Sequence, residues 1–378
     1  MNIKDSRKYF PFLNSGMIYM NHAAISPLPS PVVEAINNYI KIRSETEVEN
    51  FPDFLKLAAE TKILLSQMIN SSSADRIAFV ENTSNGLNIL TQGLTWKQDD
   101  RIILNDIEFP SNVYPFLNLK SYGVEIDFVK SKDGKVTVED IEAAITPNTK
   151  LVSISFVQFL SGYRIDLERL GKLCKSKEII FCVDSIQGLG ALQLDVQKCK
   201  IDFLSNGGHK WLMGLEGLGF IYLTEELQEK INPKYVGWTS VADAWNLLDF
   251  NLTLRKSADC FQNGTLSSVG IAALNASQKF RSSLGYDKIE ETILNNSEYF
   301  ITSLGEIGFT PLLQNVKREN LSGIVSFKSK KANEIFNALQ KENIIAAVRE
   351  GVVRLSPHFY NTREEIDKVI SVLTSIIS

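Results

Sequence analysis

Few cysteines, no long apolar run and no excess of positive charge mark this 378-residue chain. The four cysteines show no CxxC spacing, which argues against a disulfide framework or a zinc site and predicts reduced structural thiols. No run of about 18 apolar residues occurs and the start lacks the apolar core of a signal peptide, so we expect no membrane span and no export. A net charge of −4 gives no basic field for nucleic acid or anionic membrane. We therefore predict a cytoplasmic protein with small-molecule partners.

What the chain does have is a regular alternation of strand-like and helix-like segments. Between about residues 75 and 225, β-rich runs such as RIILND, LVSISFV and IIFCVDS alternate with helical patterns such as VEDIEAAI. This alternation is typical of an α/β domain with a largely parallel sheet covered by helices. Beyond about residue 280 the order of helices and strands indicates a smaller α+β domain. We predict a large domain over 15–268 and a small domain formed by 1–14 and 269–378.

Three polar sites follow predicted strands, where ligands of such sheets gather. Thr83 and Ser84 open a helical pattern after RIAFV, which suits either an anion site or an ordinary helix N-cap. Asp184 ends the apolar run IIFCV, where a carboxylate needs a cationic partner or an N-cap role. Lys210, in SNGGHKW, can be partly desolvated, which lowers its pKa and leaves a neutral amine for attack on a carbonyl.

The three histidines also fall in unusual contexts: His22 in NHAAISPLP, His209 in GGHKW and His358 in RLSPHFYNT. Each alone suits a structural role, but their distribution favours one shared site.

Together these motifs resemble the class V aminotransferase family of pyridoxal-phosphate (PLP) enzymes, which includes cysteine desulfurases and kynureninases. The resemblance runs nearly end to end, through YMNHAAISPLP, ENTSNGLN, IEFPSNVYP, VDSIQGLGALQLDV, GGHKW, FQNGTLSS and VRLSPHFYNTREEID. It implies the PLP-dependent transferase fold type I, with a mainly parallel seven-stranded sheet. It also implies PLP as cofactor, an amino acid and a 2-oxo acid as substrates, no metal, and a homodimer with shared active sites.

The resemblance gives each motif a role. Lys210 would bind the C4′ aldehyde of PLP as an internal aldimine, and Asp184 would keep the pyridine nitrogen protonated, so that the ring accepts electrons. Arg354 would clamp the substrate's α-carboxylate through two hydrogen bonds. The other expected contacts are Thr83, Ser84 and His209 on the phosphate, Thr265 on the neighbouring subunit's phosphate, Ile186 and Phe109 on the ring, Gln187 on the phenolic oxygen, and His22 and Ala23 beside the substrate. For Phe109 an ordinary core position is the alternative.

Three features depart from the desulfurase pattern. The segment before Arg354 contains no cysteine, and the nearest one, Cys260, lies 94 residues away (354 minus 260). Gly207 stands where many desulfurases have a serine, with Ser205 or the dimer partner as a replacement. The asparagine that often contacts the phenolic oxygen is absent from VQFLSG, with Gln158 or Tyr163 as replacements.

We therefore predict a PLP-dependent aminotransferase in which Lys210 moves a proton between Cα and C4′ as general base and acid. The alternatives within PLP chemistry are an epimerase, a C–S or C–Se lyase that needs no enzyme thiol, and a desulfurase-like enzyme, since the same carbanion leads to each. A non-catalytic protein that keeps the fold is the alternative from another class. The substrate side chain stays open because variable loops and the other subunit form the pocket walls.

Overall fold

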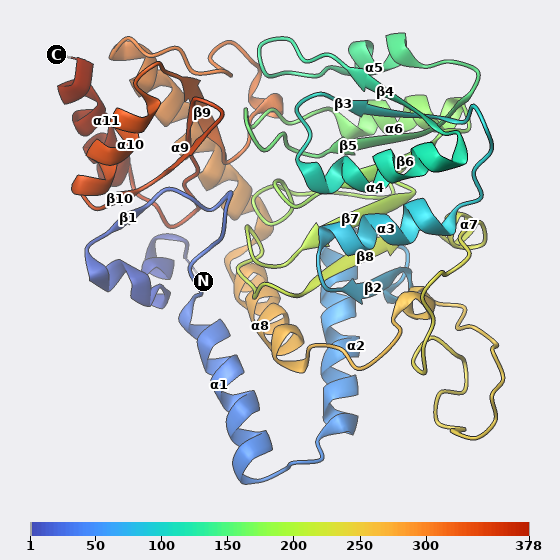
Figure 1. The fold of residues 1–378 in the computed structure, drawn as a ribbon. Helices are drawn as coiled ribbons and strands as arrows, with labels where there is room; N and C mark the ends of the chain where they lie inside the picture. Colours follow the sequence, from blue (N-terminus) through green and yellow to red (C-terminus); the bar gives the residue numbers. More distant parts are fainter. Residues whose placement is uncertain (1, 378) are drawn as a thin grey trace.

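The computed structural model describes residues 2–377, and a seven-stranded sheet lies at its centre (Figure 1). The strand order is β2-β8-β7-β6-β5-β3-β4, and all neighbours are parallel except that β8 runs antiparallel to β2 and β7. The strands are β2 (Ile77–Val80), β3 (Arg101–Asn105), β4 (Glu125–Val129), β5 (Thr149–Ser155), β6 (Ile180–Asp184), β7 (Phe203–Gly207) and β8 (Gly219–Leu223). The predicted mainly parallel seven-stranded sheet is confirmed.

The central strands are buried on both faces, because alternate side chains enter two different cores. Along β2, Ile77 and Phe79 pack in one core, whereas Ala78 and Val80 pack in the other. The first core is covered by α2 (Phe51–Met68), α5 (Val138–Ala144) and α6 (Leu167–Ser176), and the second by α3 (Thr83–Gly93), α4 (Tyr114–Leu117) and α7 (Glu225–Gln228). Burial on both faces explains why the strands read as continuous apolar runs.

Helix α3 begins immediately after β2, at the carboxyl end of the sheet. The Asn82 side chain caps this helix by accepting a hydrogen bond from the backbone N–H of Asn85 at 2.9 Å. Asn82 therefore takes the N-cap role that was the alternative function of Thr83 and Ser84. The backbone N–H groups of the first turn have no acceptor within the helix and point outward from its N-terminus.

The C-terminal part contains a three-stranded antiparallel sheet in the order β11-β12-β9. Its elements are β9 (Val325–Lys328), β11 (Ala347–Arg349), β12 (Val352–Leu355), α9 (Tyr286–Glu306), α10 (Ala332–Lys341) and α11 (Arg363–Ile377). Near the N-terminus, β1 (Ile18–Tyr19) pairs in parallel with β10 (Ile344–Ile345), so the first residues lie beside this α+β part (Figure 1). The domain bounds at residues 14 and 268 stay a prediction.

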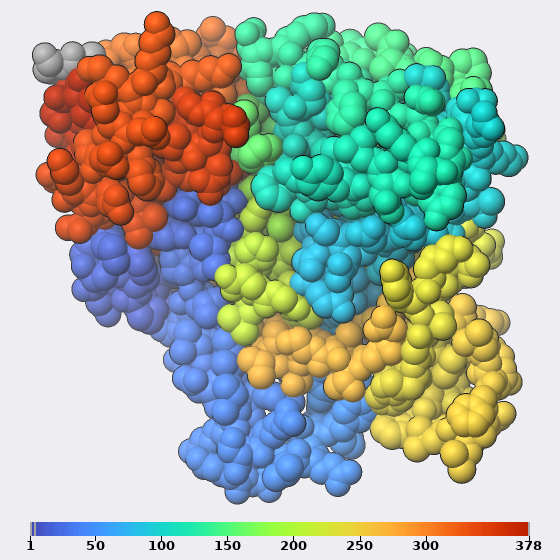
Figure 2. Space-filling model, in the orientation of Figure 1, coloured from blue at the N-terminus to red at the C-terminus, as the bar shows by residue number. Residues whose placement is uncertain are grey.

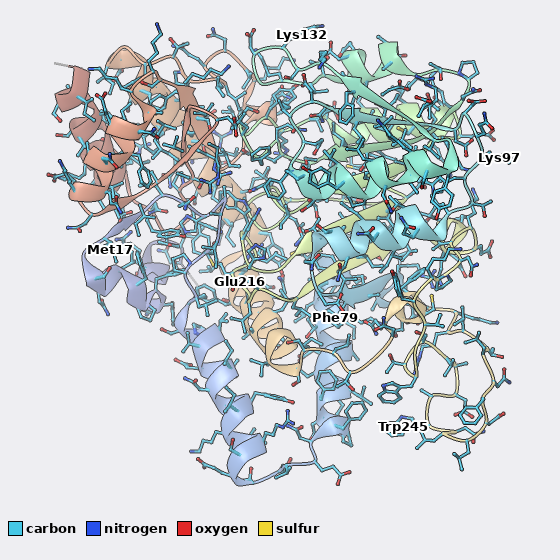
Figure 3. All side chains as sticks on the ribbon, viewed as in Figure 1. Met17, Phe79, Lys97, Lys132, Glu216 and Trp245 are labelled. Atoms are coloured by element: carbon cyan, nitrogen blue, oxygen red, sulfur yellow. The ribbon has the colours of Figure 1, made fainter. Side chains whose placement is uncertain are left out.

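Two long helices, α1 (Ser30–Glu45) and α2, extend from the central sheet. Helix α8 (Ser268–Leu284) packs against both of them. The segment 235–252 also protrudes from the molecule (yellow in Figure 2), and Trp245 lies on it well away from the sheet (Figure 3). Phe250 on this segment is 92% exposed. Within residues 2–377, no helix is long and apolar enough to cross a membrane.

Candidate active site

A cavity of about 350 Å³ lies where β6 and β7 end and α3 begins. This is the carboxyl edge of the parallel strands, where open α/β sheets bind ligands. It is lined by Ala23, Ala24, Asn82, Thr83, Ser84, Phe109, Ser111, Phe159, Asp184, Ile186, Gln187, His209, Lys210, Arg349 and Arg354. Among the residues predicted to contact cofactor or substrate, only His22 and Thr265 lie outside this lining.

Lys210 and Asp184 come from neighbouring strands and face a shared, poorly solvated space. Burial lowers the pKa of Lys210 to about 8; the Asp184 carboxylate opposes this shift, and Arg354 and Arg349 add to it. Burial raises the pKa of Asp184 to about 7, against a stabilising hydrogen bond from the backbone N–H of Ile186 at 3.0 Å. Near neutral pH the site therefore offers an amine that loses its proton easily and a carboxyl group that favours a cationic partner.

The α3 end of the cavity has the features of an anion site. The Thr83 hydroxyl is buried and has no hydrogen-bond partner among the described residues. A Cβ at Gly207 would lie 3.4 Å from the Thr83 hydroxyl oxygen and 2.8 Å from Ile186 Cδ1, so the glycine keeps this space open. His209 also lines the cavity. A free hydroxyl, free helix N–H groups and an imidazole suit a phosphate group.

Within this chain, the residues proposed to replace the missing serine and asparagine do not take over those contacts, whereas a replacement from the dimer partner stays a prediction. The Ser205 hydroxyl donates to the Thr83 carbonyl oxygen at 2.9 Å, which ties β7 to the start of α3 instead of leaving a donor for phosphate. Gln158 Nε2 donates to the Glu108 carboxylate at 3.0 Å. Tyr163 lines a different cavity, beside Glu139 and Asp166. Neither Gln158 nor Tyr163 lines the cavity at Lys210.

Gln187 is held in one orientation by two buried neighbours. Its Nε2 donates to the Ala23 carbonyl oxygen at 2.9 Å, and its Oε1 accepts from the Trp211 indole N–H at 3.2 Å. Because the indole can only donate, it fixes which end of the amide faces it. Trp211 was not predicted as a site residue, although its place directly after Lys210 and its polar N–H gave a signal.

Glu108 is a second site residue that sequence reasoning missed. Its carboxylate is buried and accepts hydrogen bonds from Asn105, Gln158 and both the backbone and the hydroxyl of Ser155. Its negative charge contributes to the raised pKa of Asp184. Glu108 therefore acts on Asp184 from nearby, while its own carboxylate is bound to protein donors.

Phe109 and Arg354 both line the cavity together with Lys210. Phe109 is 41% exposed, and its ring centroid lies 5.5 Å from Lys210 Nζ, so the core alternative does not apply. Arg354 is buried and donates through Nη1 to the Phe159 carbonyl oxygen at 2.9 Å, while its Nε has no partner among the described residues. Burial lowers the pKa of Arg354 to about 10, and neighbouring Arg349 adds to the shift. Arg354 thus keeps donors free for a carboxylate.

The three histidines do not form one site. His22 is buried and does not line the cavity, and burial lowers its pKa to about 3. The neutral ring donates from Nδ1 to the Ser356 carbonyl oxygen at 2.8 Å and accepts at Nε2 from the Tyr360 hydroxyl at 2.7 Å. His358 lies beside it, with ring centroids 5.1 Å apart. Both rings have structural partners, and only His209 reaches the cavity.

Thr265 lies apart from Lys210 within this one chain. It is exposed and lines a separate cavity of about 600 Å³, together with Asn85 and Asn88 on the outer side of α3. The expected contact with a neighbouring subunit's phosphate therefore stays a prediction.

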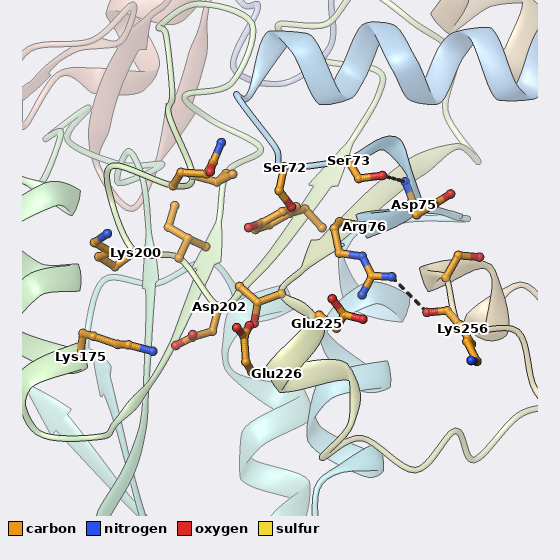
Figure 4. A pocket seen from close by; sticks show the side chains of 16 residues that line it. Ser72, Ser73, Asp75, Arg76, Lys175, Lys200, Asp202, Glu225, Glu226 and Lys256 are labelled. Carbon is orange, nitrogen blue, oxygen red and sulfur yellow. Dashed lines mark hydrogen bonds between the residues drawn. The ribbon is translucent and has the colours of Figure 1, made fainter.

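A cavity of about 620 Å³ at the opposite edge of the sheet lacks comparable chemistry (Figure 4). Arg76, which precedes β2, donates to Gln228 and to the Lys256 carbonyl oxygen. Asp202, which precedes β7, accepts from the backbone N–H of Phe181 at 2.8 Å. Arg76 and Asp202 already have protein partners, so the larger volume does not indicate the functional site.

The cavity at Lys210 fits PLP group by group. Asp184 favours a cationic ring nitrogen, the unpartnered Thr83 hydroxyl and the start of α3 suit the phosphate, and Lys210 has the lowered pKa that attack on an aldehyde requires.

Comparison with known proteins agrees with this chemistry. The model of the family described as Aminotransferase class-V matches residues 18–369. A probable cysteine desulfurase of Pyrococcus abyssi is 30% identical over 398 residues, which cover 99% of this chain and 97% of that protein. The apo structure of a cysteine desulfurase from Thermococcus onnurineus NA1 has a TM-score of 0.89 and 26% identity, covering 99% of this chain and 97% of that one. With this match over nearly its whole length, the chain belongs to the class V aminotransferase family.

Proposed function

We propose that this protein is a PLP-dependent carbon–sulfur lyase, which cleaves a sulfur-containing amino acid without using an enzyme thiol. The observation that carries the proposal is the hairpin next to the substrate arginine. Only Glu350 and Gly351 separate β11 from β12, and no cysteine is among the described residues that line the cavity. The four cysteines are all buried elsewhere. The similarity to probable cysteine desulfurases supports a sulfur amino acid as substrate.

Each residue of the cavity has a separate role in such a reaction. PLP, the cofactor of the family and of this chain, supplies an electron-accepting ring when it is bound. Arg354 holds the α-carboxylate and thereby orients the bonds at Cα. Lys210, whose pKa burial lowers to about 8, removes the α-proton as the general base. Phe109 and Phe159, whose ring centroids are 5.3 Å apart, reduce access of water to that proton.

Products distinguish this function from the others that the family chemistry allows. We expect the PLP-loaded protein to convert L-cysteine or an S-substituted L-cysteine to pyruvate, ammonium and the free sulfur product in equal amounts. Lys210→Ala should yield none of them. L-Alanine with a protein-bound persulfide would instead identify a desulfurase.

Three further outcomes would also overturn the lyase proposal. A 2-oxo acid that keeps its sulfur, with conversion of the cofactor to its amine form, would restore the aminotransferase that was predicted first. Formation of the D-amino acid would identify an epimerase. Absence of turnover across all amino acids, with PLP bound, would indicate a non-catalytic protein.

We also propose a homodimer, with Thr265 facing the neighbouring subunit's cofactor. Its support is the family resemblance of FQNGTLSS and the exposure of Thr265 beside a cavity that lacks Lys210. The exposed apolar side chains of segment 235–252 are a surface that a second copy would cover. The cytoplasmic location and a 2-oxo acid co-substrate remain predictions from the sequence.

A further inference from the structure

The cavity contains one positive group more than its expected ligands require. Asp184 suits the ring nitrogen, Lys210 the aldehyde, His209 the phosphate and Arg354 the α-carboxylate. Arg349 also lines the cavity but has no counterpart among these groups. A guanidinium is charged at every physiological pH, so an additional anion would be stabilised beside it.

Arg349 and Arg354 point to the same side of their hairpin. Ala347 lies directly opposite Arg354 in the antiparallel register, and Arg349 is two residues further along the same strand. Directly opposed residues share a face of a sheet, as do alternate residues of one strand. The two arginines are therefore diagonal neighbours, with Arg354 buried at the inner end of the cavity and Arg349 exposed at its mouth.

The Arg349 guanidinium is available for a ligand. Its hydrogen bond to protein is from Nη1 to the Val348 carbonyl oxygen at 2.9 Å. Within residues 2–377, no carboxylate lies within ion-pair distance of it. Its positive charge contributes to the lowered pKa of both Arg354 and Lys210. A bound anion would relieve this repulsion.

We propose that Arg349 forms a second anion subsite, and that the substrate is an α-amino acid whose side chain carries a second carboxylate. Arg354 would hold the α-carboxylate, and Arg349 would hold the distal one at the mouth of the cavity. The substrate class rests on the proposed function, because the lyase reaction requires an amino acid in this cavity. The anion subsite itself does not depend on which reaction follows.

Binding of unreactive ligands tests the subsite. The ligands are α,ω-dicarboxylates from succinate to pimelate, each compared with its half-amide, which keeps one carboxylate and has nearly the same shape. Isothermal titration of the PLP-loaded protein should show that, at the best chain length, the dicarboxylate binds about fivefold more tightly than its half-amide. Equal affinities at every length would overturn the proposal.

Three variants assign the difference to Arg349. Arg349→Gln should abolish the preference for the dicarboxylate, and Arg349→Lys should retain part of it. Lys328→Gln removes the same charge from an exposed position on β9 outside the cavity lining and should leave the preference intact. An equal loss in Arg349→Gln and Lys328→Gln, or a loss of PLP affinity in place of dicarboxylate affinity, would contradict the subsite. Thermal unfolding of each variant checks that the hairpin is intact.

A matched pair of substrates then tests the substrate class. S-Carboxymethyl-L-cysteine and S-carbamoylmethyl-L-cysteine differ only in the charge of the distal group. We expect a KM about fivefold lower for the carboxymethyl compound, and this difference should disappear in Arg349→Gln. Similar KM values in the wild type would refute the substrate class. If neither compound is cleaved, the lyase function fails, whereas the titration result for the subsite stands.

Discussion

At the scale of single residues, Lys210 and Asp184 are the buried pair on which the reactivity of the site depends most. Burial moves the two pKa values toward each other, to about 8 and about 7. Both groups therefore change protonation near neutral pH, although an exposed lysine and an exposed aspartate would each stay charged there. The burial that shifts the two pKa values also lowers the stability of the folded protein, because desolvation disfavours the charged forms.

We expect Lys210→Met to stabilise the cofactor-free protein in a pH-dependent way. The pKa of Lys210 falls from 10.5 to about 8 on folding, so folding releases a proton between these pH values. The buried amine therefore destabilises the fold fully below about pH 8, and this penalty vanishes toward pH 10.5. Urea unfolding should show a gain of about 1–3 kcal/mol at pH 7 and almost none at pH 10.5. A gain independent of pH would point to packing alone; Lys328→Met serves as the exposed control.

Single residues also mark what sequence could and could not predict. Thr83, Asp184 and Lys210 each follow a buried apolar run, so their place at the carboxyl edge followed from local pattern. Arg349 was missed because it shares a face with Arg354 only as a result of the β11–β12 pairing, which the local sequence does not reveal. His22 looked functional in sequence, but its partners Ser356 and Tyr360 are more than 330 residues away along the chain. Long-range partners of this kind have no local signal.

At the scale of elements, the β11–β12 hairpin is the feature that separates this site from the desulfurase pattern. Its two turn residues both have positive φ, 50° at Glu350 and 73° at Gly351. Two central residues with positive φ are typical of a type I′ turn, whose twist suits paired strands and which favours Asn-Gly. The glycine fits this geometry, but the glutamate does not. The tight turn also sets where Arg349 and Arg354 lie.

Glu350→Asn is expected to raise the free energy of unfolding by about 0.5–1 kcal/mol, because asparagine tolerates the left-handed conformation better than glutamate. Denaturant unfolding of the two proteins measures the change. Glu350→Gln removes the same charge without this conformational advantage and should give no gain. A comparable gain from glutamine would assign the effect to charge and not to backbone strain.

The elements themselves were largely predictable. The runs RIAFV, RIILND, IIFCVDS and GFIYL form β2, β3, β6 and β8, and the pattern KANEIFNALQKE forms α10. These segments have strong periodicity or continuous apolar character, which local interactions and burial both favour. The pairing of β1 with β10 was not foreseen, because two residues on each side are too short to leave a pattern.

At the scale of the whole molecule, the segment 235–252 exposes more large apolar side chains than a monomer is expected to expose. Leu248 is 86% exposed, and Leu247, Leu252 and Trp245 are each more than 60% exposed. Such a group of apolar side chains on one protruding segment marks an interaction surface (Figure 2).

We expect the protein to have twice its chain mass of 42.4 kDa in solution. Light scattering after size exclusion measures this mass. Leu248→Glu combined with Phe250→Glu should shift the mass toward one chain, since charges on a buried interface are costly. Tyr122→Glu, at an exposed aromatic outside the segment, should leave it unchanged. A wild type that is monomeric at micromolar concentration would refute the dimer.

Trp211 joins the two parts of the molecule in a way that bears on motion. Its indole ring fills the space beside Gly323, where an added Cβ would collide with the ring. The same ring donates to Gln187 in the cavity. We expect that any shift of the chain at Gly323 would displace the indole, and with it the Gln187 amide that lines the cavity. The buried tryptophan thus links the packing around Gly323 in the C-terminal part to the orientation of the Gln187 side chain in the cavity.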